Sequence, residues 1–335
     1  MPTEPCSDVG WVNRDSRLAL LRLMLLQRYA EERIMALYRQ GRIVGSVYTG
    51  YMQEAVAAGA GFALGPDDVV APLNREQACH YARGLTPADI FRQFLGKADG
   101  PTRGRDGNMH FGFPSKGVFP LASMLGVLVP VIVGAALAFK RRGEPRVAMT
   151  FWGDGAMSVG DVHESLNLAG VWQVPAVFVI QSNGFAYSTA TARTMVNTNI
   201  SERIRGGWSI PCERVDGTDV LAVHEAAAAA VARARAGDGP QALEAVTLRG
   251  HGHAAHDGAL YVPDALRAQF GDPVERLVAR LLLDGVPEEG IEALRAAARE
   301  EVESGLAEAE RSPAPDPATL EEGVYAQPLN RISGS

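Results

Sequence analysis

The segment 146–189 constrains the fold more than any other part of the chain. It begins with an apolar run rich in strand-forming residues, 147–152, and contains a second apolar run, 174–180. The stretch between the two runs has apolar residues at helical spacing on one side and polar residues on the other. Two short apolar runs joined by a helix are typical of a parallel βαβ unit that is buried on both faces. The sequence therefore predicts an α/β fold with a mostly parallel sheet.

The predicted βαβ unit places two polar turns at the same edge of the sheet, where open α/β sheets bind ligands. Gly153, Asp154 and Gly155 follow the first strand, and Asn183 follows the second. Carboxylate and amide oxygens, together with phosphate oxygens and water, are ligands that suit Mg²⁺. The two glycines permit a close approach of the backbone to a diphosphate. A helix that begins near Ala156 would direct its free N–H groups at the same anion.

The spelling GDGAxSxGDxHExxNLA…VPxxFxxxxNGxAxST over residues 153–189 resembles the α subunit of the E1 component of 2-oxoacid dehydrogenases. This family includes the pyruvate, branched-chain and acetoin dehydrogenases. The resemblance extends over about residues 15–312 and implies one doubly wound, thiamine diphosphate-binding domain with extra N- and C-terminal helices. Residues 1–14 would form an N-terminal arm and residues 313–335 a C-terminal tail. The alternative is an ordinary nucleotide-binding unit whose Gly-Asp-Gly is only a turn.

The resemblance also implies roles for residues before the βαβ unit. Arg75 matches an arginine that holds the diphosphate, and guanidinium groups pair well with phosphate oxygens. Asn74 stands where the family usually has tyrosine, and Gln77 where histidine is frequent, so the roles of those family residues do not transfer. Ser123 and Leu125 match a Ser-x-Leu that touches the aminopyrimidine of the cofactor. Ser123 is equally suited to cap the helix that follows.

The cofactors that the resemblance implies are thiamine diphosphate and Mg²⁺. Asp154, Asn183 and the backbone carbonyl of Phe185 would hold the metal against the diphosphate. Branched-chain members of the family carry a potassium site nearby. At the matching positions this chain has Val127 and Leu128, so we expect no potassium ion.

A histidine-rich loop follows Arg249 and resembles the Arg-x-His-Gly-His-Ser active-site loop of the family. On this basis Arg249 would also contact the diphosphate, and His253 would position or protonate the 2-oxo acid. His251 is a second catalytic candidate, whereas His256 is expected to be solvated. A transition-metal site at the three histidines is the alternative. Ala254 replaces the serine that mammalian members phosphorylate, so that switch cannot operate here.

Composition excludes several classes of protein. The net charge of −7 over 335 residues gives no basic footprint for nucleic acid. The longest apolar run, 125–139, is too short to span a bilayer, so we expect a buried helix and no membrane association. The three cysteines show no paired or metal-type spacing, and the N-terminus does not resemble a signal peptide. These features favour a reducing, cytoplasmic location, with Cys79 and Cys212 as buried thiols.

Other segments are interpreted as structural. The amphipathic segment 15–39 predicts a long helix that serves plain core packing. His110 lies in a glycine-rich, basic loop and is also expected to be structural. Further strands are expected at 210–215 and 241–248, and further helices at 220–236, 273–283 and 287–310.

The resemblance further implies that the chain is one half of an enzyme. Thiamine diphosphate enzymes need a glutamate on the aminopyrimidine and a second domain that binds this ring. In two-chain E1 enzymes the β subunit supplies both. We therefore expect an E1 β-like subunit as the partner, in an α2β2 heterotetramer with the site at the α–β interface. The substrate would be a 2-oxo acid, and the acyl group would pass to a lipoyl carrier.

Two other functions are kept open. The changes at Asn74, Gln77 and Ala254 motivate transfer of the acyl or two-carbon unit to an acyl carrier protein or another acceptor. A non-catalytic, cofactor-binding subunit is the second alternative. A nicotinamide dehydrogenase is disfavoured because no Gly-x-Gly-x-x-Gly follows a predicted strand.

Overall fold

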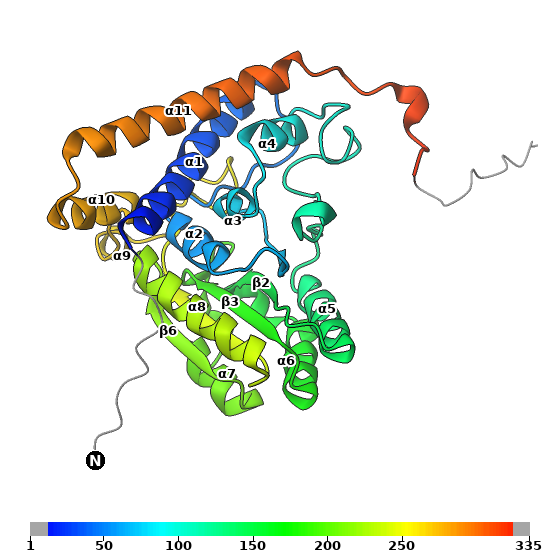
Figure 1. Ribbon diagram of the computed structural model, residues 1–335, viewed down its shortest axis with the longest axis vertical. Helices are drawn as coiled ribbons and strands as arrows, with labels where there is room; N and C mark the ends of the chain where they lie inside the picture. Colours follow the sequence, from blue (N-terminus) through cyan, green and yellow to red (C-terminus); the bar gives the residue numbers. More distant parts are fainter. Residues whose placement is uncertain (1–12, 324–335) are drawn as a thin grey trace, which may run out of the picture.

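Five parallel strands form a central sheet in the order β1-β2-β3-β7-β6 (Figure 1). This computed structural model describes residues 13–323, so most of the predicted N-terminal arm and the end of the predicted tail lie outside the described residues. The predicted βαβ unit is confirmed: β2 and β3 are parallel neighbours, with Gly153 opposite Gln181. The strands are β1 (Val69–Ala71), β2 (Ala148–Gly153), β3 (Ala176–Ser182), β6 (Cys212–Asp216) and β7 (Gln241–Val246).

Helices cover both faces of this sheet, as a doubly wound fold requires. The helices α5 (Leu128–Arg142), α6 (Gly160–Trp172) and α7 (Ile200–Trp208) precede β2, β3 and β6, which follow one another in one direction across the sheet. α8 (Val220–Ala236) precedes β7, and the connection from β6 to β7 runs in the opposite direction across the sheet. Because such crossovers are right-handed, α8 lies on the face opposite to α5, α6 and α7.

Further helices form a layer beyond α8. Figure 1 shows α1 and α11 at the top of the molecule, with α2 and α3 between α1 and the sheet. This layer comprises α1 (Arg14–Arg39), α2 (Glu54–Phe62), α3 (Gln77–Ala82), α4 (Pro87–Phe94), α10 (Pro273–Leu283) and α11 (Glu288–Arg311). The short helix α9 (Asp264–Arg267) packs instead near Phe185 and Leu248. The short elements are the hairpin β4 (Phe185–Ala186) and β5 (Thr189–Ala190) and the 3-10 turns η1 (Pro114–Lys116), η2 (Asp154–Ser158), η3 (Thr191–Arg193) and η4 (Pro317–Thr319).

Two predictions about helix starts are wrong. The chain after β2 first forms the 3-10 turn η2, and α6 begins only at Gly160 instead of near Ala156. Ser123 does not cap α5, which begins at Leu128. Gly126 has a left-handed backbone with φ +83°, and this conformation separates Ser123 from the helix. The helix is also less buried than expected, since Val131 on its outer face is 41% exposed.

The interior agrees with the predicted core in most respects. The strands β1, β2 and β3 are buried on both faces, as expected for parallel strands covered by helices. Cys79 and Cys212 are buried thiols, as predicted. No helix within residues 13–323 is long and apolar enough to cross a membrane. The expectation of plain core packing for α1 is incomplete, because its buried face carries the polar residues Gln27 and Glu31.

Candidate active site

A cavity of about 810 Å³ opens at the carboxyl ends of β1, β2, β3 and β7. Its volume lies within the usual range for small-molecule and cofactor sites. Four neighbouring strands each deliver at least one predicted residue to it, because the carboxyl ends of parallel strands meet at one edge. Of the predicted site residues His251 alone is absent from the cavity wall, which contains Arg75, Ser123, Leu125, Gly153, Asp154, Gly155, Ala156, Asn183, Phe185, Arg249 and His253.

Asp154 connects the two turns of the βαβ unit through hydrogen bonds. Its Oδ2 accepts hydrogen bonds from the Gly184 N–H at 2.7 Å and from the Thr191 hydroxyl at 2.8 Å. Its Oδ1 accepts a longer bond from the Gly155 N–H at 3.1 Å. Burial raises the pKa of Asp154 to about 6, although these three donors favour the charged form. The buried carboxylate is therefore poorly compensated and suited to a cation.

Asn183 lies at the end of β3, directly before the glycine that Asp154 binds. Its Oδ1 accepts the Phe185 N–H at 3.1 Å, which leaves a second lone pair on this amide oxygen. Gly155 is packed so closely that a Cβ there would lie 2.8 Å from the Ala186 Cβ. The glycine is thus required for the η2 turn to lie against the β4 hairpin.

Two arginines line the same cavity. The Arg75 guanidinium donates to the Thr49 carbonyl at 2.5 Å and to the His253 carbonyl at 2.6 Å. Arg249 donates to the Tyr187 carbonyl at 2.6 Å, and its other recorded contacts are a ring nitrogen and a phenol. Burial and the charge of Arg249 lower the pKa of Arg75 to about 10. Within residues 13–323 neither guanidinium meets a carboxylate, so the pair is suited to an anionic ligand.

His253 is held between two tyrosine rings. Its ring centroid lies 5.3 Å from that of Tyr48 and 4.4 Å from that of Tyr187. Arg249 Nη1 lies 3.2 Å from His253 Nδ1. A guanidinium can only donate, so Nδ1 is the acceptor and the neutral ring carries its proton on Nε2. The loop backbone is fixed by Asp257, which accepts the His253 N–H at 2.7 Å.

We expect His253 to titrate near pH 4 in the ligand-free protein. Burial, followed by the charges of Arg75 and Arg249, lowers the pKa of His253 from 6.5 to about 4. The unfolded chain binds this proton below about pH 6.5 and the folded chain only near pH 4. His253 therefore lowers stability as pH falls through this window. NMR titration of the imidazole resonances, assigned with His253→Gln, measures this pKa, and a midpoint near 6.5 would contradict the assigned environment.

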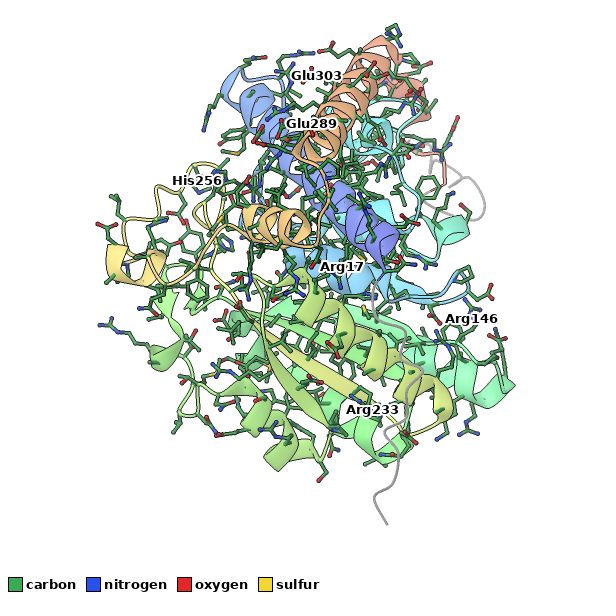
Figure 2. All side chains as sticks on the ribbon, turned by 60° about the vertical axis from the view of Figure 1, so that its left-hand side comes forward. Arg17, Arg146, Arg233, His256, Glu289 and Glu303 are labelled. Carbon is green, nitrogen blue, oxygen red and sulfur yellow. The ribbon has the colours of Figure 1, made fainter. Side chains whose placement is uncertain are left out.

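The alternative of a transition-metal site at the three histidines is wrong. His251 stacks on Tyr51 at 4.5 Å, with its Nδ1 2.9 Å from the Thr49 hydroxyl. Figure 2 shows His256 on the outside of the loop, where its side chain is exposed as predicted. In the described part of the chain, no group of three or more His, Cys, Asp or Glu side chains is arranged to hold a metal. The three imidazoles have three different environments and do not converge.

The sequence does not predict the roles of several residues that line the cavity or contact its wall. Thr191 contacts Asp154 from η3, and Tyr48 and Tyr187 flank His253 from distant segments. Their residue types and spacing carry no recognisable signal. His110 was expected to be structural, but it lines the cavity and its Nε2 lies 2.9 Å from the Ser123 hydroxyl. Ser123 is therefore held by a histidine at the cavity wall.

The cavity residues fit a metal-bound diphosphate. A carboxylate and an amide oxygen are adjacent at the strand ends, as Mg²⁺ requires, and two guanidiniums are available for phosphate oxygens. Buried polar atoms of the cavity wall also have no partner among the described residues. These atoms are the Asn74 Oδ1, the Glu76 Oε1, the Asn108 Oδ1 and the Gln181 Nε2. Since buried polar groups are normally hydrogen-bonded, their arrangement suits a polar ligand.

Comparison with known proteins identifies the family. The model of the family described as "Dehydrogenase E1 component" matches residues 21–318. The chain belongs to the dehydrogenase E1 component family. The predicted resemblance to the thiamine diphosphate-dependent E1 α subunits is thereby confirmed, and the family implies this cofactor.

Individual relatives match over nearly their whole length. The α subunit of acetoin:2,6-dichlorophenolindophenol oxidoreductase of Cupriavidus necator is 36% identical over 326 residues, which cover 94% of this chain and 95% of the relative. The pyruvate dehydrogenase E1 component α subunit of Zymomonas mobilis is 36% identical over 309 residues, covering 90% and 86%. The Bacillus subtilis acetoin enzyme α subunit is 30% identical over 316 residues, covering 94% and 95%. The relatives are α subunits, so this E1-type chain is expected to need further subunits.

Proposed function

We propose that this chain is the α subunit of a thiamine diphosphate- and Mg²⁺-dependent E1 enzyme that decarboxylates a 2-oxo acid and transfers the acyl group to a lipoyl carrier. The observation that carries the proposal is the arrangement of Asp154, Asn183, Arg75 and Arg249 around one cavity at four adjacent strand ends. Family membership and the pyruvate dehydrogenase relatives support decarboxylation of a 2-oxo acid, whereas transfer to a lipoyl carrier is part of the proposal.

The cavity residues form two groups. One group, at what we call the diphosphate end, would bind the diphosphate and its metal, and the other, on the reaction side, would face the reacting substrate. Asp154, Asn183 and the Phe185 carbonyl would hold Mg²⁺, while Arg75 and Arg249 would neutralise the phosphate oxygens. Gly153, Gly155 and Ala156 would line the diphosphate, and Ser123 and Leu125 the aminopyrimidine. When bound, thiamine diphosphate supplies the carbon nucleophile for the 2-oxo carbon and stabilises the negative charge left when CO₂ departs.

His253 would serve the reaction side of the site. Its neutral ring carries a proton on Nε2, as Arg249 occupies Nδ1. This N–H can donate to the carboxylate or oxo group of the substrate and can deliver a proton during the reaction. The low pKa keeps His253 neutral at pH 7, so it does not repel the two arginines. His251, off the cavity wall, would support the loop through Thr49.

A second polypeptide is expected to complete the cavity. Apolar side chains at its rim are exposed to solvent: Val44 by 89%, Met124 by 66% and Leu125 by 64%. Exposed apolar patches at a functional rim commonly mark protein interfaces. We propose an E1 β-like subunit that covers this rim in an α2β2 heterotetramer and supplies the glutamate for the aminopyrimidine.

The purified chain alone should therefore decarboxylate no 2-oxo acid, and addition of its β-like partner should restore activity that depends on thiamine diphosphate and Mg²⁺. The measurement is CO₂ release with pyruvate and branched-chain 2-oxo acids, using an artificial electron acceptor. Omission of Mg²⁺ after chelation is the control. Robust decarboxylation by the single chain would contradict the shared site.

The acyl acceptor requires a separate test. Asn74 lines the cavity where the family usually has tyrosine, and its Oδ1 is buried without a partner among the described residues. This difference keeps open a different acceptor, such as an acyl carrier protein. Supplying the assembled enzyme with a lipoyl domain or with a holo-acyl carrier protein distinguishes the two by the acylated product. Unchanged activity in an assembled Asp154→Ala enzyme would favour a non-catalytic role.

A further inference from the structure

The buried face of α1 carries a polar pair that core packing does not explain. Gln27 is 0% and Glu31 2% exposed. They are one helical turn apart, and the Gln27 Nε2 donates to the Glu31 Oε1 at 3.0 Å. Burying an amide and a carboxyl destabilises a fold unless their hydrogen bonds compensate. The partners of this pair therefore indicate what it does.

Gln27 holds the backbone at Arg75 and at Ala78, three residues further along the chain. Its Nε2 also donates to the Arg75 carbonyl at 2.8 Å, and its Oε1 accepts the Ala78 N–H at 2.8 Å. Both donors and the acceptor of this amide are thus occupied. A hydrophobic residue of similar length at position 27 would leave the Arg75 carbonyl and the Ala78 N–H without these partners.

Glu31 fixes the segment that faces the Arg75 turn. Its Oε1 accepts the Gly50 N–H at 2.8 Å. Gly50 is in very close contact with its surroundings, and a Cβ there would overlap the Arg75 carbonyl and the Gln27 amide. The residue before it, Thr49, offers the carbonyl that accepts from the Arg75 guanidinium. The pair on α1 therefore holds both the backbone of Arg75 and one acceptor of its side chain.

Arg75 also links the Gln27–Glu31 pair to segment 249–258, the loop that carries His253. Its Nη2 donates to the His253 carbonyl at 2.6 Å. The contacts thus form a continuous path from the α1 pair, through Arg75, to the loop that carries His253. The hydrogen bonds to the Thr49 and His253 carbonyls define the position of the Arg75 guanidinium.

We infer that Gln27 and Glu31 are positioning residues that hold Arg75 at the diphosphate end of the cavity and, through it, hold the His253 loop. The inference rests on the proposed function for the role of Arg75 in cofactor binding. Its effect on the loop does not depend on that function, because the hydrogen bonds exist in the ligand-free chain.

A comparison of glutamine and methionine at position 31 tests the role of the Glu31 oxygen. Burial and the nearby Glu54 raise the pKa of Glu31 well above its usual range. Its Oε2 has no hydrogen-bond partner among the described residues. Glutamine at this position keeps an oxygen for the Gly50 N–H, whereas methionine removes it. Glu31→Gln should therefore behave like the wild type, and Glu31→Met should not.

The test compares the full-length variants Gln27→Met, Glu31→Met and Glu31→Gln. Gln241→Met is the matched control, because Gln241 is a buried glutamine with hydrogen bonds at the amino end of β7. Hydrogen–deuterium exchange of segment 249–258 in the ligand-free chain is the first readout. The second readout is kinetic. The kcat and the KM for thiamine diphosphate are measured separately in the enzyme assembled with its partner, to show which of the two changes.

We expect the two methionine variants to expose segment 249–258 to faster exchange and to raise the cofactor KM about ten- to hundredfold, since small displacements of a positioning group have effects of this size. Glu31→Gln should retain wild-type exchange and KM, and Gln241→Met should lower only the melting temperature. Gln27→Asn, which keeps a neutral amide but is one methylene shorter, serves if Gln27→Met does not fold.

Two results would overturn the inference. The first is that the two methionine variants show the same exchange rates and the same KM for thiamine diphosphate as Gln241→Met, because the pair would then serve stability alone. The other is a Glu31→Gln variant as impaired as Glu31→Met. Failure of the proposed function gives a different result: the wild type would show no dependence on thiamine diphosphate, while the exchange measurement would still test the coupling of the pair to the loop.

Discussion

Replacing Asp154 by asparagine should lower the activity of the assembled enzyme at least about a hundredfold, more than the ten- to hundredfold typical for residues outside the metal coordination sphere. The substitution removes the buried negative charge that would meet Mg²⁺. In either orientation of the amide, its NH₂ group also faces a donor, either the Gly184 and Thr191 groups that bind Oδ2 or the Gly155 N–H that binds Oδ1. Calorimetry should accordingly find no magnesium-dependent uptake of thiamine diphosphate.

Asp68→Asn is the matched control for this variant. Asp68 is a buried carboxylate that accepts the N–H groups of Gly65 at 2.7 Å and Val147 at 2.8 Å and pairs with Arg235. It lies at the amino end of the sheet, opposite the cavity. We expect Asp68→Asn to lower the melting temperature and to leave cofactor binding unchanged. Magnesium-dependent binding that survived in Asp154→Asn would exclude Asp154 as the metal ligand.

Replacing His253 by alanine should lower kcat about 10²- to 10⁴-fold, the usual contribution of a positioned acid–base group. The affinity for thiamine diphosphate should change little, because Arg75 and Arg249 carry the proposed phosphate contacts. His253→Phe should be equally impaired, although it keeps a ring between Tyr48 and Tyr187. Steady-state kinetics of the assembled enzyme, with substrate and cofactor varied separately, measures both effects.

His256→Ala provides the control within the same loop. His256 is exposed, and Figure 2 shows its side chain on the outside of the molecule. This variant should retain wild-type kcat and KM. If His253→Phe were fully active, the role of His253 would be the ring stacking alone. If only the cofactor KM rose in His253→Ala, His253 would belong to the diphosphate end of the site.

The residues at the carboxyl ends of β2 and β3 are predictable from the sequence because local patterns define them. Gly153, Asp154 and Asn183 each lie within three positions of the end of an apolar run, and the position of a residue after a buried strand determines the edge of the sheet at which it lies. Helix starts were less predictable. Ser123 has the residue type of a cap, but the left-handed backbone at Gly126 separates it from α5.

The surroundings of His253 could not be predicted in the same way. Tyr48, Tyr187 and Arg75 reach this histidine from three segments that are distant in the sequence. No periodicity links these positions, and the pKa of His253 depends on the burial and charges that they produce together. The same holds for Gln27, whose two backbone partners lie 48 and 51 positions away in the chain.

The sequence by itself determined the parallel α/β fold, the family and the identity of the residues at the strand ends, because hydrophobic periodicity and turn composition are local properties. Only the tertiary structure decided which side chains share the cavity, that His253 is neutral with its proton on Nε2, and that α1 supports Arg75. The physical reason is that burial, charge–charge interaction and hydrogen-bond geometry depend on groups brought together by folding, and these groups are separated along the chain.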